Sequence, residues 1–175
     1  MTFIPDSFIP PSVFETPHLS LEILSAAHAV QDYECVMACA DAIRGVFGPS
    51  NGWPGKNMSF GENLADLNRH ESEFYARAAF AYAIFDKATP RCYTGCLYIK
   101  PIKSKVENDR RKVLFDAQAF CWFSSKASSR EFAGRAAEEI MHWVKESWPF
   151  NAVAFPGRTI GWDEWDSLAA AKTGF

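Results

Sequence analysis

The chain has 175 residues, of which 48% are apolar and 15% are aromatic, which is enough for one domain with a sizeable core and excludes a disordered tail. The formal net charge of -3 argues against a protein that binds nucleic acid by neutralising phosphates, and no apolar run is long enough to span a bilayer. The first six residues lack the basic and apolar regions of a secretory signal, and the cysteines are odd in number. We therefore expect a cytoplasmic protein with reduced thiols.

The first seventeen residues carry four of the ten prolines, interleaved with apolar side chains. Because proline interrupts both helices and sheet ladders, residues 1–17 are predicted to form an extended arm that packs onto the body or onto a partner subunit. Residues 18–175 are predicted to form a single domain. Its first element is a strand at 18–24, where apolar and polar residues alternate.

Two helices are predicted next. The first spans roughly 32–47, with Asp32 as its N-cap and a glycine after its last residue. The second spans roughly 61–77. Leu67 and Phe74 lie on its inward stripe, whereas His70 and Glu73 are expected to lie mostly on the solvated side.

Three strands follow at 78–85, 91–102 and 113–123, and their short links predict an antiparallel meander. The clearest helix spans about 129–147, where Ser128 and Glu131 have the spacing of a capping box. A short apolar strand at 151–155 comes next. Because a strand–helix–strand crossover normally makes its two strands parallel, this strand is predicted to run parallel to 113–123. A last short helix is expected at 162–172.

This order of elements resembles that of the GNAT superfamily of N-acetyltransferases, and individual segments resemble a poorly characterised bacterial branch of it. The segments that carry the resemblance are residues 32–37 (DYECVM), 53–54 (WP), 62–67 (ENLADL), 79–82 (AFAY), 95–101 (GCLYIKP), 148–150 (WPF) and 156–158 (PGR). The resemblance covers about residues 18–158. It implies an α+β fold with a mixed, mostly antiparallel sheet and helices on both faces.

The resemblance also implies a seat for acetyl-CoA. In that family, the strands corresponding to 113–123 and 151–155 splay apart, and the cofactor lies in the wedge between them, with its pyrophosphate on N–H groups at the start of the long helix. An open N–H near 121–123 would polarise the thioester carbonyl. The cofactor-binding residues implied in this way are Trp122, Phe123, Ser124, Ser125, Lys126, Ser128, Ser129 and Arg130.

Three residues are candidates for the catalytic chemistry. Asp116 shares a strand face with aromatic residues, where a desolvated carboxylate has a raised pKa and can act as a base, although an exposed position at the strand start is the alternative. Glu73, with His70 beside it, lies on a helix that often borders the acceptor pocket in GNAT proteins; the alternative is a solvated helix face. Tyr98 is placed to protonate the leaving thiolate, or is a core residue.

The resemblance therefore predicts an acetyl-CoA-dependent N-acetyltransferase that acts on a small-molecule or peptide amine. The alternative is a non-catalytic domain that binds acyl-CoA or another small ligand as a sensor, because residues 123–131 lack the glycines of the usual pyrophosphate motif. A chance likeness to the GNAT fold is the third reading. No metal is expected, since the cysteine pairs lack the spacing of zinc knuckles. The proline-rich arm and the late tryptophans make a homodimer an expectation.

Overall fold

The computed structural model describes residues 3–88, 90–124 and 130–169, with the side chains of residues 130 and 131 left out. Six strands form one sheet in the order in which they occur along the chain. The strands are β1 (Val13–Glu15), β2 (Leu19–Ile23), β3 (Phe80–Asp86), β4 (Cys92–Lys100), β5 (Ala117–Phe123) and β6 (Val153–Ala154). All neighbouring strands are antiparallel except β5 and β6, which are parallel as the crossover predicts.

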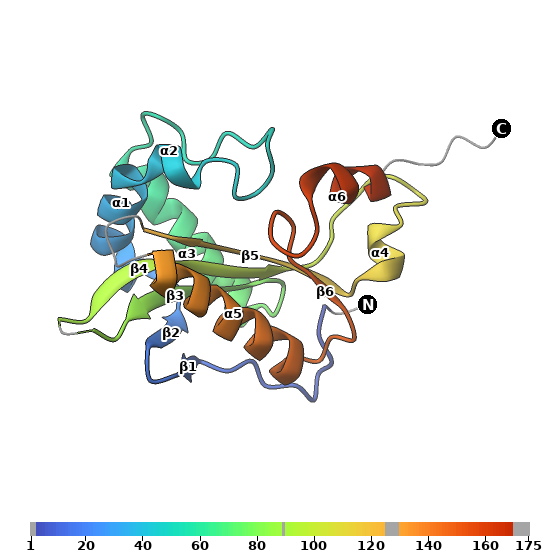
Figure 1. The fold of residues 1–175 in the computed structure, drawn as a ribbon, viewed down its shortest axis with the longest axis horizontal. Helices are drawn as coiled ribbons and strands as arrows, with labels where there is room; N and C mark the ends of the chain where they lie inside the picture. Colours follow the sequence, from blue (N-terminus) through green and yellow to red (C-terminus); the bar gives the residue numbers. More distant parts are fainter. Residues whose placement is uncertain (1–2, 89, 125–129, 170–175) are drawn as a thin grey trace.

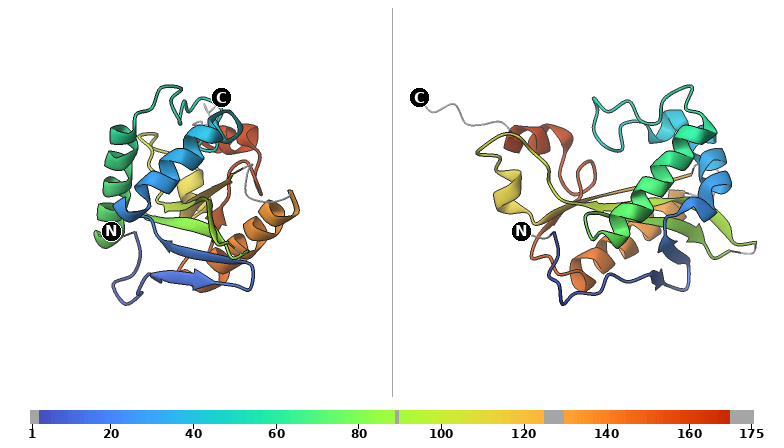
Figure 2. Two further views of the ribbon diagram at one scale, coloured as in Figure 1. Left: turned by 90° about the vertical axis from the view of Figure 1, so that its left-hand side faces the viewer. Right: turned by 180° about the vertical axis from the view of Figure 1, so that it is seen from behind.

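Helices cover both faces of the sheet (Figures 1 and 2). They are α1 (Ala29–Ala38), α2 (Ala40–Ile43), α3 (Phe60–Tyr75), α4 (Arg111–Leu114), α5 (Arg130–Ser147) and α6 (Trp162–Ala169), with a 3-10 turn η1 (Ala26–His28) before α1. Seen end-on, α1 and α3 lie on one face and α5 on the other (Figure 2). The predicted α+β fold, with a mixed and mostly antiparallel sheet, is confirmed.

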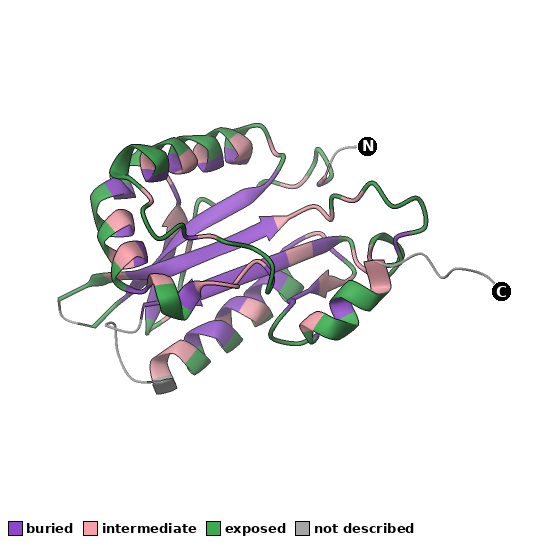
Figure 3. Cartoon of the chain, turned by 90° about the horizontal axis from the view of Figure 1, so that it is seen from above, coloured by how far each residue is buried: buried purple, intermediate pink, exposed green. Residues whose placement is uncertain are grey.

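The alternation of side chains along the strands divides the core into two layers. In β3, Phe80, Tyr82 and Ile84 are fully buried in the layer that contacts α5. Ala81 and Ala83 point the other way and pack with residues of α1 and α3. Because both faces are covered, the central strands are buried along most of their length (Figure 3).

The N-terminal arm packs onto the body, one of the two outcomes predicted for it. Ile4 is only 1% exposed and belongs to the core layer beneath α5. The Phe8 ring lies 5.3 Å from that of Trp148, and Arg77 donates hydrogen bonds to the carbonyls of Pro5 and Phe8. The arm also contributes β1, the outermost strand of the sheet.

Three boundaries differ from the prediction. The helix expected at 32–47 is interrupted at Cys39, so that α1 and α2 are separate. Asp32 is not an N-cap, because α1 already begins at Ala29. The strand expected at 113–123 begins only at Ala117, since residues 111–114 form the short helix α4, on which Val113 is 84% exposed.

The start of α3 carries a capping box in the sequence, Ser59 and Glu62, that the prediction of this helix did not use. Ser59 accepts a hydrogen bond from the Glu62 N–H, and the Glu62 carboxylate accepts one from the Ser59 N–H. This reciprocal capping box satisfies two N–H groups that a helix start otherwise leaves without partners. It fixes where α3 begins, and α3 forms one wall of the site described next.

Candidate functional site

The strands β5 and β6 part after a short stretch of pairing. Ala117 pairs with Val153 and Gln118 with Ala154, after which β6 ends whereas β5 continues for five more residues to Phe123. A cavity of about 450 Å³, which we call the wedge, lies where the two segments separate. It is lined by residues 42–46, 120–123 and 156–158, together with Ala133 and Trp162. The predicted splaying of these strands is confirmed.

The open edge of β5 faces the wedge. Ser124 donates its N–H to the Thr94 carbonyl of β4, and hydrogen-bonded pairs alternate along an antiparallel ladder. Cys121 and Phe123 therefore turn their backbone groups away from β4, toward the side on which β6 has already ended. In the described part of the chain, the Cys121 carbonyl accepts one hydrogen bond, from the Arg158 guanidinium at 3.0 Å.

A second, larger cavity of about 670 Å³ adjoins the wedge. We call it the aromatic cavity, because six of its lining side chains are Phe47, Trp53, Tyr98, Phe120, Trp162 and Trp165. Its floor is formed by β4 and β5, and its walls by α3, α6 and the loop between α2 and α3. In Figure 1, α6 and this loop lie above β5. Phe120 and Trp162 line both cavities, so the two share a border.

Asp32 is a buried carboxylate on the lining of the aromatic cavity. It is 3% exposed and accepts hydrogen bonds from the Tyr93 hydroxyl and, at 2.7 Å, from the Asn63 amide. Burial raises its pKa above the ordinary value of an aspartate, although those hydrogen bonds oppose the shift. The partners lie 31 and 61 positions away in the sequence, which is why a local reading treats Asp32 as a helix cap.

His70 is buried on the same lining, contrary to the prediction of a mostly solvated position. It is 8% exposed, its ring lies 5.2 Å from that of Tyr98, and its Nδ1 lies 3.6 Å from the Glu73 carboxylate. Burial, together with the nearby cations Arg69 and Lys100, lowers the pKa of His70 to about 3. A signal for this burial was present, since His70 lies three residues after Leu67 and four before Phe74, on the apolar stripe of α3.

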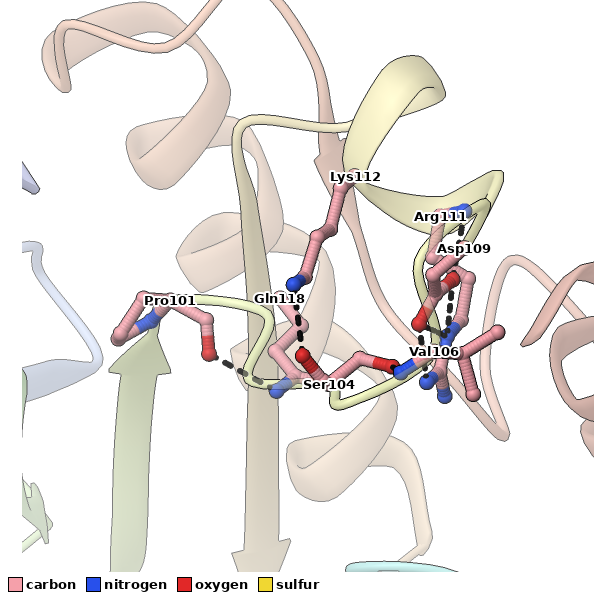
Figure 4. Close-up of polar contacts among 7 residues, drawn as sticks. All are labelled: Pro101, Ser104, Val106, Asp109, Arg111, Lys112 and Gln118. Atoms are coloured by element: carbon pink, nitrogen blue, oxygen red, sulfur yellow. Dashed lines mark hydrogen bonds and ion pairs between the residues drawn. The ribbon is translucent and has the colours of Figure 1, made fainter.

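The connection between β4 and α4 joins two residues that line the aromatic cavity, Lys100 and Arg111, and is held by side-chain hydrogen bonds (Figure 4). Arg111 donates hydrogen bonds to both carboxylate oxygens of the buried Asp109, with the shortest distance at 2.7 Å. Hydrogen bonds from the guanidinium hold the pKa of Asp109 well below its usual range. Gln118 donates its amide to the Pro101 carbonyl at 3.1 Å. These contacts fix the position of Arg111 on the cavity lining.

Several solved structures of acetyltransferases share this architecture. The ribosomal L7/L12 α-N-protein acetyltransferase RimL in complex with coenzyme A has a TM-score of 0.56 and 15% identity, covering 77% of this chain and 69% of that one. The ribosomal-protein-S5-alanine acetyltransferase from Vibrio fischeri has a TM-score of 0.54 and 13% identity, covering 78% and 69%. The chain has the GNAT fold.

A third GNAT neighbour is the microcin C7 self-immunity acetyltransferase MccE in complex with acetyl-CoA and AMP. Its TM-score is 0.53 and its identity 13%, covering 79% of this chain and 69% of that chain. No protein-family model and no curated protein sequence matches the chain. At such low identity, these neighbours establish the GNAT fold alone, and the chemistry has to be argued from the residues of the site.

The GNAT-based catalytic candidates lie in different places. Tyr98 lines the aromatic cavity, is 3% exposed and accepts a hydrogen bond from the Trp122 indole at 3.3 Å. Burial raises its pKa well above the ordinary tyrosine value. Glu73 is half-buried and contacts two cavity residues, His70 and Arg69, rather than the cavity itself.

Asp116 lies outside both cavities. It precedes β5, is exposed, and its Oδ2 accepts hydrogen bonds from the N–H groups of Asn151 at 2.7 Å and Ala152 at 3.1 Å. The structure therefore has the stated alternative, an exposed position at the strand start, and not a desolvated carboxylate inside an aromatic strand. The carboxylate instead fastens the segment before β6 to the start of β5.

The cofactor-binding residues implied by the GNAT resemblance are only partly described. Trp122 and Phe123 line the wedge, whereas Ser124 lines a separate small cavity beside Cys35 and its hydroxyl lies 3.3 Å from the Cys39 sulfur. Ser125, Lys126, Ser128 and Ser129 lie outside the described residues. Arg130 is the first residue of α5, and its side chain is likewise outside the description.

Two observations concern other classes of site and protein. Within the described ranges, no group of three histidine, cysteine, aspartate or glutamate side chains is arranged to hold a metal ion. No helix in this part of the chain is long and apolar enough to cross a membrane.

Proposed function

We propose that this protein is an acetyl-CoA-dependent N-acetyltransferase that acts on a primary amine. The observation that carries the proposal is the border between the two cavities. The wedge offers an open strand edge to an extended, amide-containing chain, and the aromatic cavity offers a separate space for an acceptor. Phe120 and Trp162 stand between them, where an acetyl group would pass from one ligand to the other.

The residues of the wedge suit the pantetheine part of acetyl-CoA. The backbone groups of Cys121 and Phe123 face the wedge and can pair with amides, as an added strand would. Positive charge from Lys126 and Arg130, with the serines around them, would hold the phosphates at the start of α5. Acetyl-CoA supplies the acetyl group as an activated thioester.

The chain's own residues account for the proton transfers of the reaction. The amine must lose a proton as its nitrogen bonds to the acetyl carbon, and the thiolate released when the C–S bond breaks must gain one. Asp32 is our candidate for accepting the first proton, because it lines the aromatic cavity and its raised pKa suits a base. Tyr98 lines the same cavity, and its hydroxyl is our candidate for donating the second proton to the thiolate.

Binding of acetyl-CoA tests the wedge directly. Isothermal titration should give micromolar affinity for the unmodified protein, and the double variant Lys126→Ala/Arg130→Ala should bind more weakly. Ala133→Leu, which fills the wedge from α5, should also weaken binding, whereas the matched change Ala65→Leu on the exposed surface of α3 should not. Lack of binding at millimolar acetyl-CoA would overturn the proposal.

Turnover separates an enzyme from a binding domain. Release of free CoA thiol in the presence of a panel of primary amines should be detectable and should fall about 100-fold or more in Asp32→Asn, the range typical of a lost general base. Micromolar binding without turnover on any amine would instead identify a GNAT-fold domain that binds acyl-CoA without catalysis.

A further inference from the structure

The charges around the aromatic cavity are unevenly neutralised. Three cations, Arg69, Lys100 and Arg111, and three carboxylates, Asp32, Asp66 and Asp166, line it. Arg69 contacts Asp66 at 3.0 Å and a second carboxylate at 3.3 Å. Arg111 contacts the buried carboxylate of Asp109 at 2.7 Å. The two arginines therefore already have anionic partners within the protein.

Lys100 differs from them. No carboxylate oxygen among the described residues lies within 4.0 Å of its ammonium nitrogen. That nitrogen lies instead 4.7 Å from the ring centre of Phe47 and 5.1 Å from that of Tyr98. Aromatic faces attract a cation without neutralising it, and Lys100 is half-buried at the end of β4. Such a cation favours an anionic group on the ligand that fills the cavity.

The shape and lining of the cavity limit the rest of the ligand. Its volume of about 670 Å³ is that of a site for a small molecule. Its six aromatic side chains favour a flat apolar ring, which they can contact edge-on or face-on. Lys100 pairs with Gln118, and Phe120 lies two residues further along β5, about 7 Å away in an extended strand. An anionic group at Lys100 and an amine near Phe120 therefore fit within one small molecule.

We infer that the acceptor is a small aromatic amino acid, or a close analogue of one, whose carboxylate pairs with Lys100. Its ring lies among the aromatic side chains, and its amine points toward the border with the wedge. That this ligand is an acceptor rests on the proposed acetyl transfer. The binding that it predicts needs no acetyl-CoA and can be measured alone.

L-Tryptophan and L-tryptophanamide are suitable probes, because they share the ring and the amine and differ in the carboxylate. Binding of each to the full chain, without acetyl-CoA, is measured by titration calorimetry or ligand-observed NMR. We expect L-tryptophan to bind about tenfold or more tightly than the amide, as a charge-assisted contact predicts. Lys100→Met should reduce the affinity for L-tryptophan to that for the amide. It should leave the affinity for the amide unchanged. Lys105→Met, at an exposed position of the connection that follows β4, should change neither.

Three results would overturn the inference. They are equal affinity for the two probes, equal weakening of both in Lys100→Met, and no binding of either probe. The second would assign Lys100 to the structure of the cavity rather than to an anion. Acetyl-CoA binding is measured on the same preparation, because it depends on the wedge and not on Lys100. Acetyl-CoA binding that persists alongside any of these three results would overturn the inference about the acceptor and leave the proposed acetyl transfer standing.

Discussion

The guanidinium of Arg158 donates a hydrogen bond to the Cys121 carbonyl across the wedge, at 3.0 Å. Arg158 follows β6 and Cys121 lies in β5, so a side chain from one segment occupies the backbone edge of the other after the two have separated. Its guanidinium also lies 5.7 Å from the ring centre of Phe123. Any ligand that pairs with this edge of β5 has to compete with Arg158 for the carbonyl.

Arg158→Ala should therefore tighten the binding of S-acetylpantetheine, a probe that has the amides and thioester of the proposed cofactor but no nucleotide. One hydrogen bond to a carbonyl contributes about 1 kcal/mol, which corresponds to about fivefold in affinity. Titration calorimetry of both proteins measures the change, and Arg110→Ala, exposed and outside both cavities, serves as the control. Weaker binding to Arg158→Ala would show that the guanidinium holds the ligand instead.

Replacing His70 should make the protein less sensitive to acid. The pKa of His70 is lowered to about 3 in the folded chain but is about 6.5 in an unfolded one, so the unfolded state binds the proton first. The contribution of neutral His70 to stability is therefore complete above about pH 6.5 and is lost as the pH falls toward 3. His70→Gln removes this loss, which reaches about 1.4 kcal/mol per pH unit.

Denaturant unfolding at a series of pH values measures this difference. The free energy of unfolding should fall less steeply in His70→Gln than in the unmodified protein between about pH 6 and pH 4. His142→Gln, an exposed position on α5, should retain the original slope. Identical slopes for all three proteins would show that His70 takes up its proton in the folded state as readily as in the unfolded one.

Gly95→Ala should disrupt the pairing of β4 with β5. A Cβ at this position would lie 1.9 Å from the Trp122 carbonyl oxygen, and backbone atoms cannot move aside as a flexible side chain can. We expect a loss of about 3 kcal/mol or more in stability, measured as the free energy of unfolding in denaturant.

Gly134→Ala on α5 is the matched control for Gly95→Ala. Among the described residues, and apart from the backbone of its own helix, a Cβ there meets no atom within 4 Å, so the change should stabilise the helix by about 0.5–1 kcal/mol. A mild effect at Gly95, similar in size to that at Gly134, would mean that β4 and β5 can separate locally at low cost.

Asp116→Asn separates a structural role from a catalytic one. The change keeps the size of the side chain and weakens its hydrogen bonds to the N–H groups of Asn151 and Ala152, so we expect a loss of about 1–2 kcal/mol in stability. Turnover below the melting transition should be little affected. Asp6→Asn, exposed in the arm, is the control. A stable Asp116→Asn protein with strongly reduced turnover would restore Asp116 as the candidate base.

The fold was predictable because its strongest signals are local. The alternation of Phe80, Tyr82 and Ile84 follows the two-residue period of a strand, and the apolar spacing of α5 follows the period of a helix. The short links of the meander and the single crossover then leave few topologies. These signals depend on residues that are close together in the sequence, so they can be recognised without knowing the fold.

The site was less predictable because its contacts join distant segments. Asp32 looks like a helix cap until Tyr93 and Asn63 are brought to it by β4 and α3. Asp116 looks like part of an aromatic strand, but Asn151 and Ala152 hold it outside β5. In both cases the role of the carboxylate is decided by its partners in three dimensions.

The order of strands has a consequence for the synthesis of the chain. Because each strand pairs with its predecessor, the part of the sheet from β2 to β5 contains all its pairing partners once residue 123 has been made. The second side of the wedge is added only with residues 156–158, after the crossover through α5. A ribosome-bound chain that stops before β6 can therefore form most of the sheet and still have no wedge. Capture of such chains on an acyl-CoA matrix would report completion of the polypeptide rather than formation of its meander.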